Sequence, residues 1–273
     1  VDTSSSVTFY CSGYWTGVEF TEMMSSATTS GTAAWVDWDV GALGVPDGSI
    51  CSVACCNHQD AAQSQLGVRT NGSALARYHT VHQALSSSTE TTDCDCFTIS
   101  VVSNASDGLI EYYNNGGSVS KYHLLGYFGS GLYYTETVWK LATGSAADQV
   151  WTDVDMSAYV PANAIMDCMV ANTRSFAYYV GARANGSSLQ RKWVAHQPED
   201  TYRSGECIPT AVDASSVYEM IDYDWAYIRN GPYGYYTTTA PPQVAVFSPS
   251  ANSFSDTSWS NPTYAYSDNT QYA

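Results

Sequence analysis

Cysteine is the residue type in this sequence with the most definite chemistry. Eight cysteines are present, and an even number favours disulfide pairing. Cys168 and Cys207 are the only two in the second half of the chain, and the internal alignment given below matches them with Cys51 and Cys96. We therefore predict two equivalent disulfides, Cys51–Cys96 and Cys168–Cys207. The pairing of the other four stays open: Cys11, Cys55, Cys56 and Cys94.

Two residue patterns offer ligands for a metal ion. Cys94-Asp-Cys96 and Cys55-Cys56 lack the two-residue spacing of zinc ligands, which favours disulfides instead. Asp-x-Asp occurs twice, and because residues i and i+2 of a strand share a face, each pair concentrates oxygen ligands that suit Ca²⁺. The favoured interpretation is a solvated acidic edge that opposes aggregation. The four residues are Asp37, Asp39, Asp153 and Asp155.

Side chains that could perform catalysis are few. His79 and His82 resemble a ligand pair, but residues i and i+3 of a strand face opposite ways. The sequence has no nucleophile elbow, no glycine-rich phosphate loop and no HExxH motif. We therefore expect a protein that is not an enzyme. Because carboxylates are abundant, four arginines are expected to pair with acidic residues: Arg69, Arg77, Arg183 and Arg191.

Two features connect the chain with sugars. The 22 tyrosines and eight tryptophans exceed what small cores need, and exposed aromatic rings serve both protein interfaces and sugar-binding faces. Ordinary packing on strands is the alternative. Three Asn-x-Ser sequons are candidate glycosylation sites, although turn chemistry alone explains the two Asn-Gly pairs. The sequon residues are Asn71, Asn104 and Asn185.

The elements that position these residues are repeated. Residues 66–83 (LGVRTNGSALARYHTVHQ) and 180–197 (VGARANGSSLQRKWVAHQ) share nine of eighteen positions, which predicts two copies of one domain. The match extends upstream, where WVDWD at 35–39 aligns with WTDVD at 151–155. Gly13-Tyr14-Trp15 aligns with Gly126-Tyr127-Phe128, and downstream Cys96 aligns with Cys207. Each copy is therefore a domain of ordinary size.

Within each copy the pattern is that of β-structure. Short runs rich in Val, Ile, Tyr and Thr, such as 97–101, are bounded by turn residues. Asn71-Gly72 and Asn185-Gly186 predict hairpin turns. We predict an all-β chain of two tandem homologous β-sandwich (jelly-roll-like) domains, residues 1–117 and 118–233. Residues 234–273 are predicted to form an extended C-terminal tail or arm, in which only 243–247 reads as a strand.

Composition restricts the environment and the partners. The net charge is −16, with 10 basic residues, so a nucleic-acid partner is not expected. No apolar run is long enough to span a bilayer. The chain starts Val1-Asp-Thr without Met, which suggests a processed N-terminus. Few lysines, many hydroxyl side chains and paired cysteines together favour an extracellular location, secreted or on a cell or virion surface.

The string from Trp151 to Ala162 (WTDVDMSAYVPA), followed by residues 180–191, resembles a β-sandwich module of environmental bacterial and phage surface proteins. Tandem copies of that module resemble protomers of extracellular fibrils from freshwater. The resemblance covers about residues 7–230 and implies a self-assembling structural role without catalytic residues. We expect a protomer of an extracellular helical filament, assembling head to tail with a terminal arm. A carbohydrate-binding or phage adhesin module, with glycans as partners, is the alternative.

Overall fold

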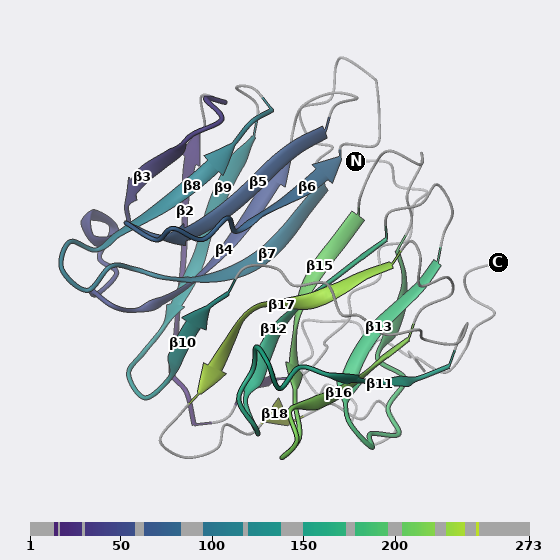
Figure 1. Cartoon of the computed structure of the whole chain (residues 1–273). Helices are drawn as coiled ribbons and strands as arrows, with labels where there is room; N and C mark the ends of the chain where they lie inside the picture. The colour runs from purple at the N-terminus through teal and green to yellow at the C-terminus, as the bar shows by residue number, and fades with distance from the viewer. Residues whose placement is uncertain are drawn as a thin grey trace, which may run out of the picture.

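The chain forms two β-sandwiches, seen in a computed structural model (Figure 1). The model describes residues 14–15, 17–28, 31–57, 63–82, 95–116, 120–137, 150–172, 178–195, 204–221, 228–237 and 244–245. Every sheet in these residues is antiparallel. No helix among them is long and apolar enough to cross a membrane.

The first sandwich consists of two four-stranded sheets. One sheet has the order β2-β9-β4-β7, with β2 at Phe20–Thr28, β9 at Lys121–Phe128, β4 at Ile50–Asn57 and β7 at Asp95–Val102. The other has the order β3-β8-β5-β6, with β3 at Trp35–Asp39, β8 at Leu109–Asn114, β5 at Gln63–Thr70 and β6 at Tyr78–His82. One turn of 3-10 helix, Gly41–Leu43, follows β3.

The second sandwich repeats this arrangement. Its sheets have the orders β10-β17-β12-β15 and β11-β16-β13-β14. The first sheet consists of β10 at Tyr133–Glu136, β17 at Ile228–Thr237, β12 at Ile165–Asn172 and β15 at Ser204–Ala211. The second consists of β11 at Thr152–Asp155, β16 at Val217–Ile221, β13 at Tyr178–Ala184 and β14 at Lys192–Ala195.

Both sandwiches have jelly-roll topology. The eight strands of each are divided between two four-stranded sheets, and successive strands change sheet except for the hairpins β5-β6 and β13-β14. The last strand returns to lie between the first and the third. Strand by strand, β2 corresponds to β10, β4 to β12, β7 to β15 and β9 to β17. The predicted fold class, tandem homologous jelly-roll-like domains, is confirmed.

The sandwich boundaries differ from the predicted ones. Strand β9 lies beyond residue 117, yet it pairs with β2 and β4 of the first sandwich. Strand β17 likewise runs past residue 233 to Thr237. The sequence contains three similar tripeptides, at 13–15, 126–128 and 234–236. The predicted alignment matched the first with the second, whereas the second corresponds to the third. The register places Gly126-Tyr127-Phe128 opposite β4 just as Gly234-Tyr235-Tyr236 lies opposite β12.

Each sandwich has its own core, and the two cores meet at β12. In β9, buried and less buried residues alternate, as expected for a strand with one face on a core. In β12 all eight residues are buried. Met166 and Val170 belong to the second core, whereas Met169 and Ala171 pack into the core cluster of the first sandwich. The sandwiches are therefore packed directly against each other.

Part of the tail is described as well. Val244–Ala245 forms strand β18, inside the predicted strand 243–247, and pairs with β1 at Tyr14–Trp15. The Trp15 ring contacts Phe128 of the first sandwich and Tyr236 of the second, at centroid distances of 5.8 and 4.8 Å. Residues 1–13 and the rest of the tail lie outside the described residues.

Candidate functional site

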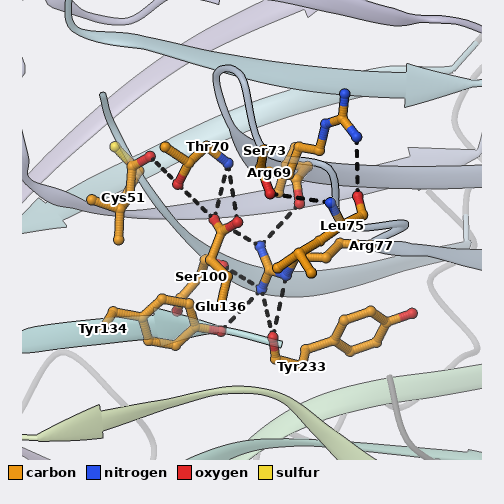
Figure 2. A network of polar contacts seen from close by, with 12 residues as sticks. Cys51, Arg69, Thr70, Ser73, Leu75, Arg77, Ser100, Tyr134, Glu136 and Tyr233 are labelled. Carbon is orange, nitrogen blue, oxygen red and sulfur yellow. Dashed lines mark hydrogen bonds and ion pairs between the residues drawn. The ribbon is translucent and has the colours of Figure 1, made fainter. Parts of the chain in front are cut away.

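The surface where the two sandwiches meet, here called the joint, is centred on Arg77 (Figure 2). Arg77 directly precedes β6, and its side chain is fully buried. Its Nη1 lies 3.1 Å from Glu136 Oε1 on β10 of the other sandwich. The guanidinium also donates hydrogen bonds of 2.9–3.2 Å to four oxygens: the carbonyls of Val68, Ser100 and Tyr233 and the hydroxyl of Tyr134. One arginine thus connects both sandwiches.

Burial and charge act in opposite directions on this arginine. Desolvation lowers the pKa of Arg77, but Glu136, Tyr134 and Asp167 raise it, and the net direction is upward. The side chain therefore stays cationic. Glu136 is only 7% exposed and accepts further hydrogen bonds from the backbone N–H and hydroxyl of Thr70, at 3.0 Å each. Removing either partner of this buried ion pair would leave the other charge uncompensated, which strongly destabilises a fold.

The edge strand β7 supplies the second set of contacts in the joint. An edge strand exposes unpaired N–H groups. Here Ser100 N–H donates to Asp167 Oδ2 at 3.1 Å, and Thr98 N–H donates to Glu206 Oε1 at 3.2 Å. The hydroxyls of Ser100 and Tyr236 are also hydrogen-bonded to each other. Carboxylates of the second sandwich therefore cover the edge of the first.

Asp167 makes the joint sensitive to pH. Burial raises the pKa of its carboxyl above the ordinary value, although the hydrogen bond from Ser100 and the charge of Arg77 oppose the shift. Between the unfolded pKa, about 4, and the folded pKa, the folded chain binds more protons. The free energy of unfolding should therefore fall as pH rises through that window.

The D167N variant should lack this contribution of Asp167. Urea unfolding of both proteins, from the ordinary Asp pKa of about 4 upward, should show the wild type losing stability relative to D167N as pH rises. A difference between the two that does not change with pH would contradict a raised pKa of Asp167.

The predicted disulfides Cys51–Cys96 and Cys168–Cys207 are wrong. Cys96 is bonded to Cys56, directly opposite it on β4, while Cys51 lies opposite Val101. Cys168 lies opposite Ile208 and Cys207 opposite Met169, so the two thiols point to opposite faces of their sheet. Cys51, Cys55, Cys168 and Cys207 are free and buried. Burial raises the pKa of the Cys51 thiol to about 12, which keeps it protonated and unreactive.

The misaligned repeat explains this error. The register of β4 with β7 and of β12 with β15 makes Cys56 equivalent to Ala171 and Cys96 equivalent to Gly205. Gly205 has no room for a side chain, because a Cβ there would lie 2.7 Å from the Cβ of Ala171. The disulfide of the first sandwich therefore has no counterpart in the second.

The Asp-x-Asp residues lie on β3 and β11. Among the described residues, no three His, Cys, Asp or Glu side chains lie close enough together to hold a metal ion. Asp37 and Asp153 are exposed on β3 and β11. Asp39 accepts a 2.8 Å hydrogen bond from Ala42 N–H, and Asp155 accepts one from Ser157 N–H at 2.8 Å, which lowers the pKa of the Asp155 carboxyl. These two carboxylates stabilise the turns that follow their strands.

The three sequon asparagines lie at half-exposed turns. The Asn185 amide donates to Asp213 at 2.7 Å, the Asn104 amide to the carbonyl of Asn71 at 3.3 Å, and the Asn71 amide contacts Asp107 at 3.5 Å. Their side chains thus support turn structure, and glycosylation of these residues stays a prediction.

Arg69, Arg77 and Arg183 pair with carboxylates, as expected. Two form a repeated unit: Arg69 lies 2.7 Å from Glu111 and 4.1 Å from the ring centre of Trp35. Arg183, Glu219 and Trp151 form the same unit in the second sandwich, at 2.7 and 4.1 Å. Since the unit recurs without change, its role is structural.

One surface differs between the copies, and we call it the aromatic row: Trp35, Tyr113 and Tyr78, side by side across β3, β8 and β6. Ring centres are 5.3 Å apart for Trp35 and Tyr113, and 4.9 Å for Tyr113 and Tyr78, which are stacked. The two tyrosines meet across Gly67, which carries no side chain. All three rings are partly exposed on the outer face of the sheet.

The second sandwich does not repeat this row. The register puts Ile221 at the position of Tyr113 and Lys192 at the position of Tyr78. Gln65 and Asn115, hydrogen-bonded to each other at 2.9 Å, border the row in the first sandwich. The surplus of aromatic residues is visible in the sequence but their positions are not, because only the strand register brings these three together.

The joint was not predicted from the sequence either. Its partners Arg77 and Glu136 are 59 residues apart; Arg77 was one of four arginines expected to pair with carboxylates, and Glu136 was not singled out. The sequence signal nearest to the joint is the repeated Gly-Tyr-aromatic tripeptide at 126–128 and 234–236, because Gly234 lies opposite Glu136.

No known protein family matches the chain, and no curated protein is similar to it in sequence. Solved structures with a similar fold include the N-terminal CBM22-1-CBM22-2 tandem domain of Xyn10C from Paenibacillus barcinonensis. The match covers 83% of this chain and 95% of that one, at 7% sequence identity and a TM-score of 0.20. At this level of likeness, the function of the chain has to be inferred from its own side chains.

Proposed function

We propose that this chain is a structural protomer of an extracellular filament and assembles head to tail with copies of itself. The observation that supports this proposal is the asymmetry of the joint. The first sandwich contributes its β6/β7 edge, and the second contributes the outer face of its sheet β10-β17-β12-β15. We call these two surfaces the donor edge and the acceptor face.

Because the sandwiches are repeats, each has one donor edge and one acceptor face. The joint uses one of each, and it also covers Ile50 and Phe128 on the β2-β9-β4-β7 face of the first sandwich, which are buried in one cluster with Tyr134 and Tyr236. Among the described residues, the β14/β15 edge of the second sandwich and the β2 part of that face remain exposed. A contact between these two surfaces would be heterologous, so each added chain presents both surfaces again. Contacts of this kind that do not close into a ring produce a fibre.

The β2 part of the remaining acceptor face has the exposure expected of an unused contact surface. In the second sandwich all of β12 is buried, but in the first, Ser52 and Ala54 of β4 are partly exposed. Phe20 and Met24 of β2 are 40% and 76% exposed. Large exposed apolar side chains on the same strand favour a protein–protein contact.

Three further properties suit an extracellular fibre. The buried ionic joint fixes the angle between the sandwiches, which a regular filament requires. The disulfide Cys56–Cys96 favours an oxidising compartment. The net charge of −16 opposes lateral clumping of filaments.

Electron microscopy and sedimentation of the purified full chain test this function. Filaments of regular repeat, forming above a threshold concentration, are the expected result. A chain that stays monomeric, or that forms only closed oligomers at every concentration and Ca²⁺ level, would refute it.

A carbohydrate-binding role is the second candidate, and the aromatic row favours it. Stacking on tryptophan and tyrosine rings is a common way to bind sugars, with neighbouring amides donating hydrogen bonds. Gln65 and Asn115 offer such amides beside the rings. The row occurs in one copy only, as expected of a binding site and not of a structural repeat.

A single substitution tests this second candidate. W35A should weaken binding to an arrayed glycan at least about tenfold, since a central tryptophan contributes about 2 kcal/mol or more to a contact. W151A is the matched control, because it removes the same stacking on arginine in the copy without the row. Equal binding by both variants, or no glycan bound by the wild type, would exclude the row as a sugar site.

A further inference from the structure

We propose that the aromatic row binds an uncharged linear glycan, with Gln65 and Asp37 as polar contacts on its two sides. The proposal rests on the second candidate function, carbohydrate binding, and names the class of sugar. It does not depend on filament assembly. Its support comes from the residues that border the row and from their replacement in the second sandwich.

Polar residues border the row on both sides. The strand register gives one neighbouring line of Asp37, Glu111 and Arg69 across β3, β8 and β5. On the other side of the row lie Gln65 and Asn115. Residues i and i+2 of a strand share a face, so both borders lie on the same outer face as the rings.

Gln65 offers a hydrogen-bond donor in a fixed position. Its backbone N–H donates to Asn115 Oδ1 at 2.7 Å, and its Oε1 accepts from Asn115 Nδ2 at 2.9 Å. In the part of the chain that the structure describes, Gln65 Nε2 donates to no protein acceptor. A sugar hydroxyl beside the row can therefore accept a hydrogen bond from this amide without breaking another.

Asp37 offers an acceptor and sets the charge of the site. Its side chain is exposed on β3, and no described residue donates to it or pairs with it. Glu111, in contrast, is neutralised by Arg69 at 2.7 Å. A carboxylate without a cation accepts hydrogen bonds from sugar hydroxyls but repels sugar carboxylates. The net charge of −16 adds to this repulsion, which favours an uncharged glycan.

The rings of the row are held in place by the fold. The guanidinium of Arg69 lies 4.1 Å from the ring centre of Trp35, and the carbonyl of Tyr78 accepts a 2.9 Å hydrogen bond from the Tyr233 hydroxyl of the second sandwich. Side chains fixed in this way lose little conformational entropy on binding. The ring centres follow one another at 5.3 and 4.9 Å across the strands, so the row is elongated and suits a chain of sugars.

The second sandwich replaces these residues together. The register puts Ile221 and Lys192 at the positions of the two tyrosines, and Tyr179 at the position of Gln65. The Lys192 ammonium lies 5.0 Å from the ring centre of Tyr179. The same sandwich thus forms without the row and without its amide border, so building the fold does not require them.

Substitutions taken from the second sandwich test the row. The variant Y113I/Y78K gives the first sandwich the residues of the second. It should lower the affinity for neutral oligosaccharides at least about tenfold, since buried aromatic anchors dominate such contacts. The probes are linear oligosaccharides of glucose, mannose, xylose and N-acetylglucosamine, from the monosaccharide to the hexasaccharide, titrated calorimetrically into the full chain. Affinity for the bound series should increase from the monosaccharide to the trisaccharide.

Oligogalacturonates of the same lengths test the charge. They should bind more weakly than the neutral chains. D37N should narrow this difference about fivefold, the effect of two unit charges about 4 Å apart in water. D153N is the matched control, because Asp153 has the equivalent exposed position on β11, in the sandwich without the row.

Circular dichroism of each variant confirms that the sandwiches are folded before binding is measured. If the wild type and Y113I/Y78K bind neutral chains equally, the row is not the site, while carbohydrate binding stands. Oligogalacturonates bound as tightly as neutral chains would overturn the uncharged class, and a monosaccharide bound as tightly as its trisaccharide would overturn the linear chain. If the wild type binds no glycan, the second candidate function fails and this inference with it.

Discussion

Replacing Arg77 with methionine should lower the free energy of unfolding by about 3–5 kcal/mol, because it leaves the buried Glu136 carboxylate without its cation. Methionine keeps most of the apolar stem but none of the hydrogen bonds. The carbonyls of Ser100 and Tyr233 lose a donor as well. Urea unfolding monitored by tryptophan fluorescence measures the change.

Two variants separate this effect from the loss of any arginine. R191M makes the same change at the equivalent, partly exposed position and should cost much less. The double variant R77M/E136Q removes both charges, so it should recover a large part of the loss, because a neutral amide costs far less to bury than an unpaired carboxylate. Losses of equal size for R77M and R191M would show that the ion pair does not stabilise the joint.

Removing the disulfide Cys56–Cys96 should cost about 4 kcal/mol, the loop-closure value for a bridge spanning about 40 residues. The variant C56A/C96G is the suitable test, since the second sandwich has Ala171 and Gly205 at these positions and folds around them. Guanidinium unfolding of the wild type and the variant under non-reducing conditions measures the difference.

A reductant and peptide mapping complete this test. Reductant should destabilise the wild type by a similar amount, whereas C56A/C96G should lack the part of that response due to this bridge. Peptide mapping of the unreduced chain should recover a linked Cys56–Cys96 peptide. A linked peptide joining Cys51 to Cys96, or Cys168 to Cys207, would contradict the structure.

The sequence was sufficient to predict the architecture because architecture follows from local patterns. Alternating apolar residues in 97–101 predict a strand, and β7 includes them. The two Asn-Gly pairs predict turns, and Gly72 and Gly186 adopt the left-handed conformation with φ of 77° and 72°. The shared motif of residues 66–83 and 180–197 predicts two similar domains, and both are jelly rolls.

Which residues face one another was decided only by the tertiary structure. Side chains alternate between the faces of a strand, so the register decides which cysteines meet, and a register shift between Ser52 and Val53 moves the pairing of β4 with β9 by one residue. No local pattern reports such a shift. The misaligned repeat gave Cys51 the partner that Cys56 has, and it placed the boundary at residue 117, before β9.

The joint and the aromatic row also depend on long-range contacts. Arg77 reads in the sequence as one of four similar arginines, yet packing buries it at the joint and leaves Arg191 half exposed. What the sequence by itself determined is the repeated jelly roll, because local periodicity and turn residues specify strands. What only the tertiary structure decided is how the repeats contact each other, because burial and strand register arise from residues far apart in the chain.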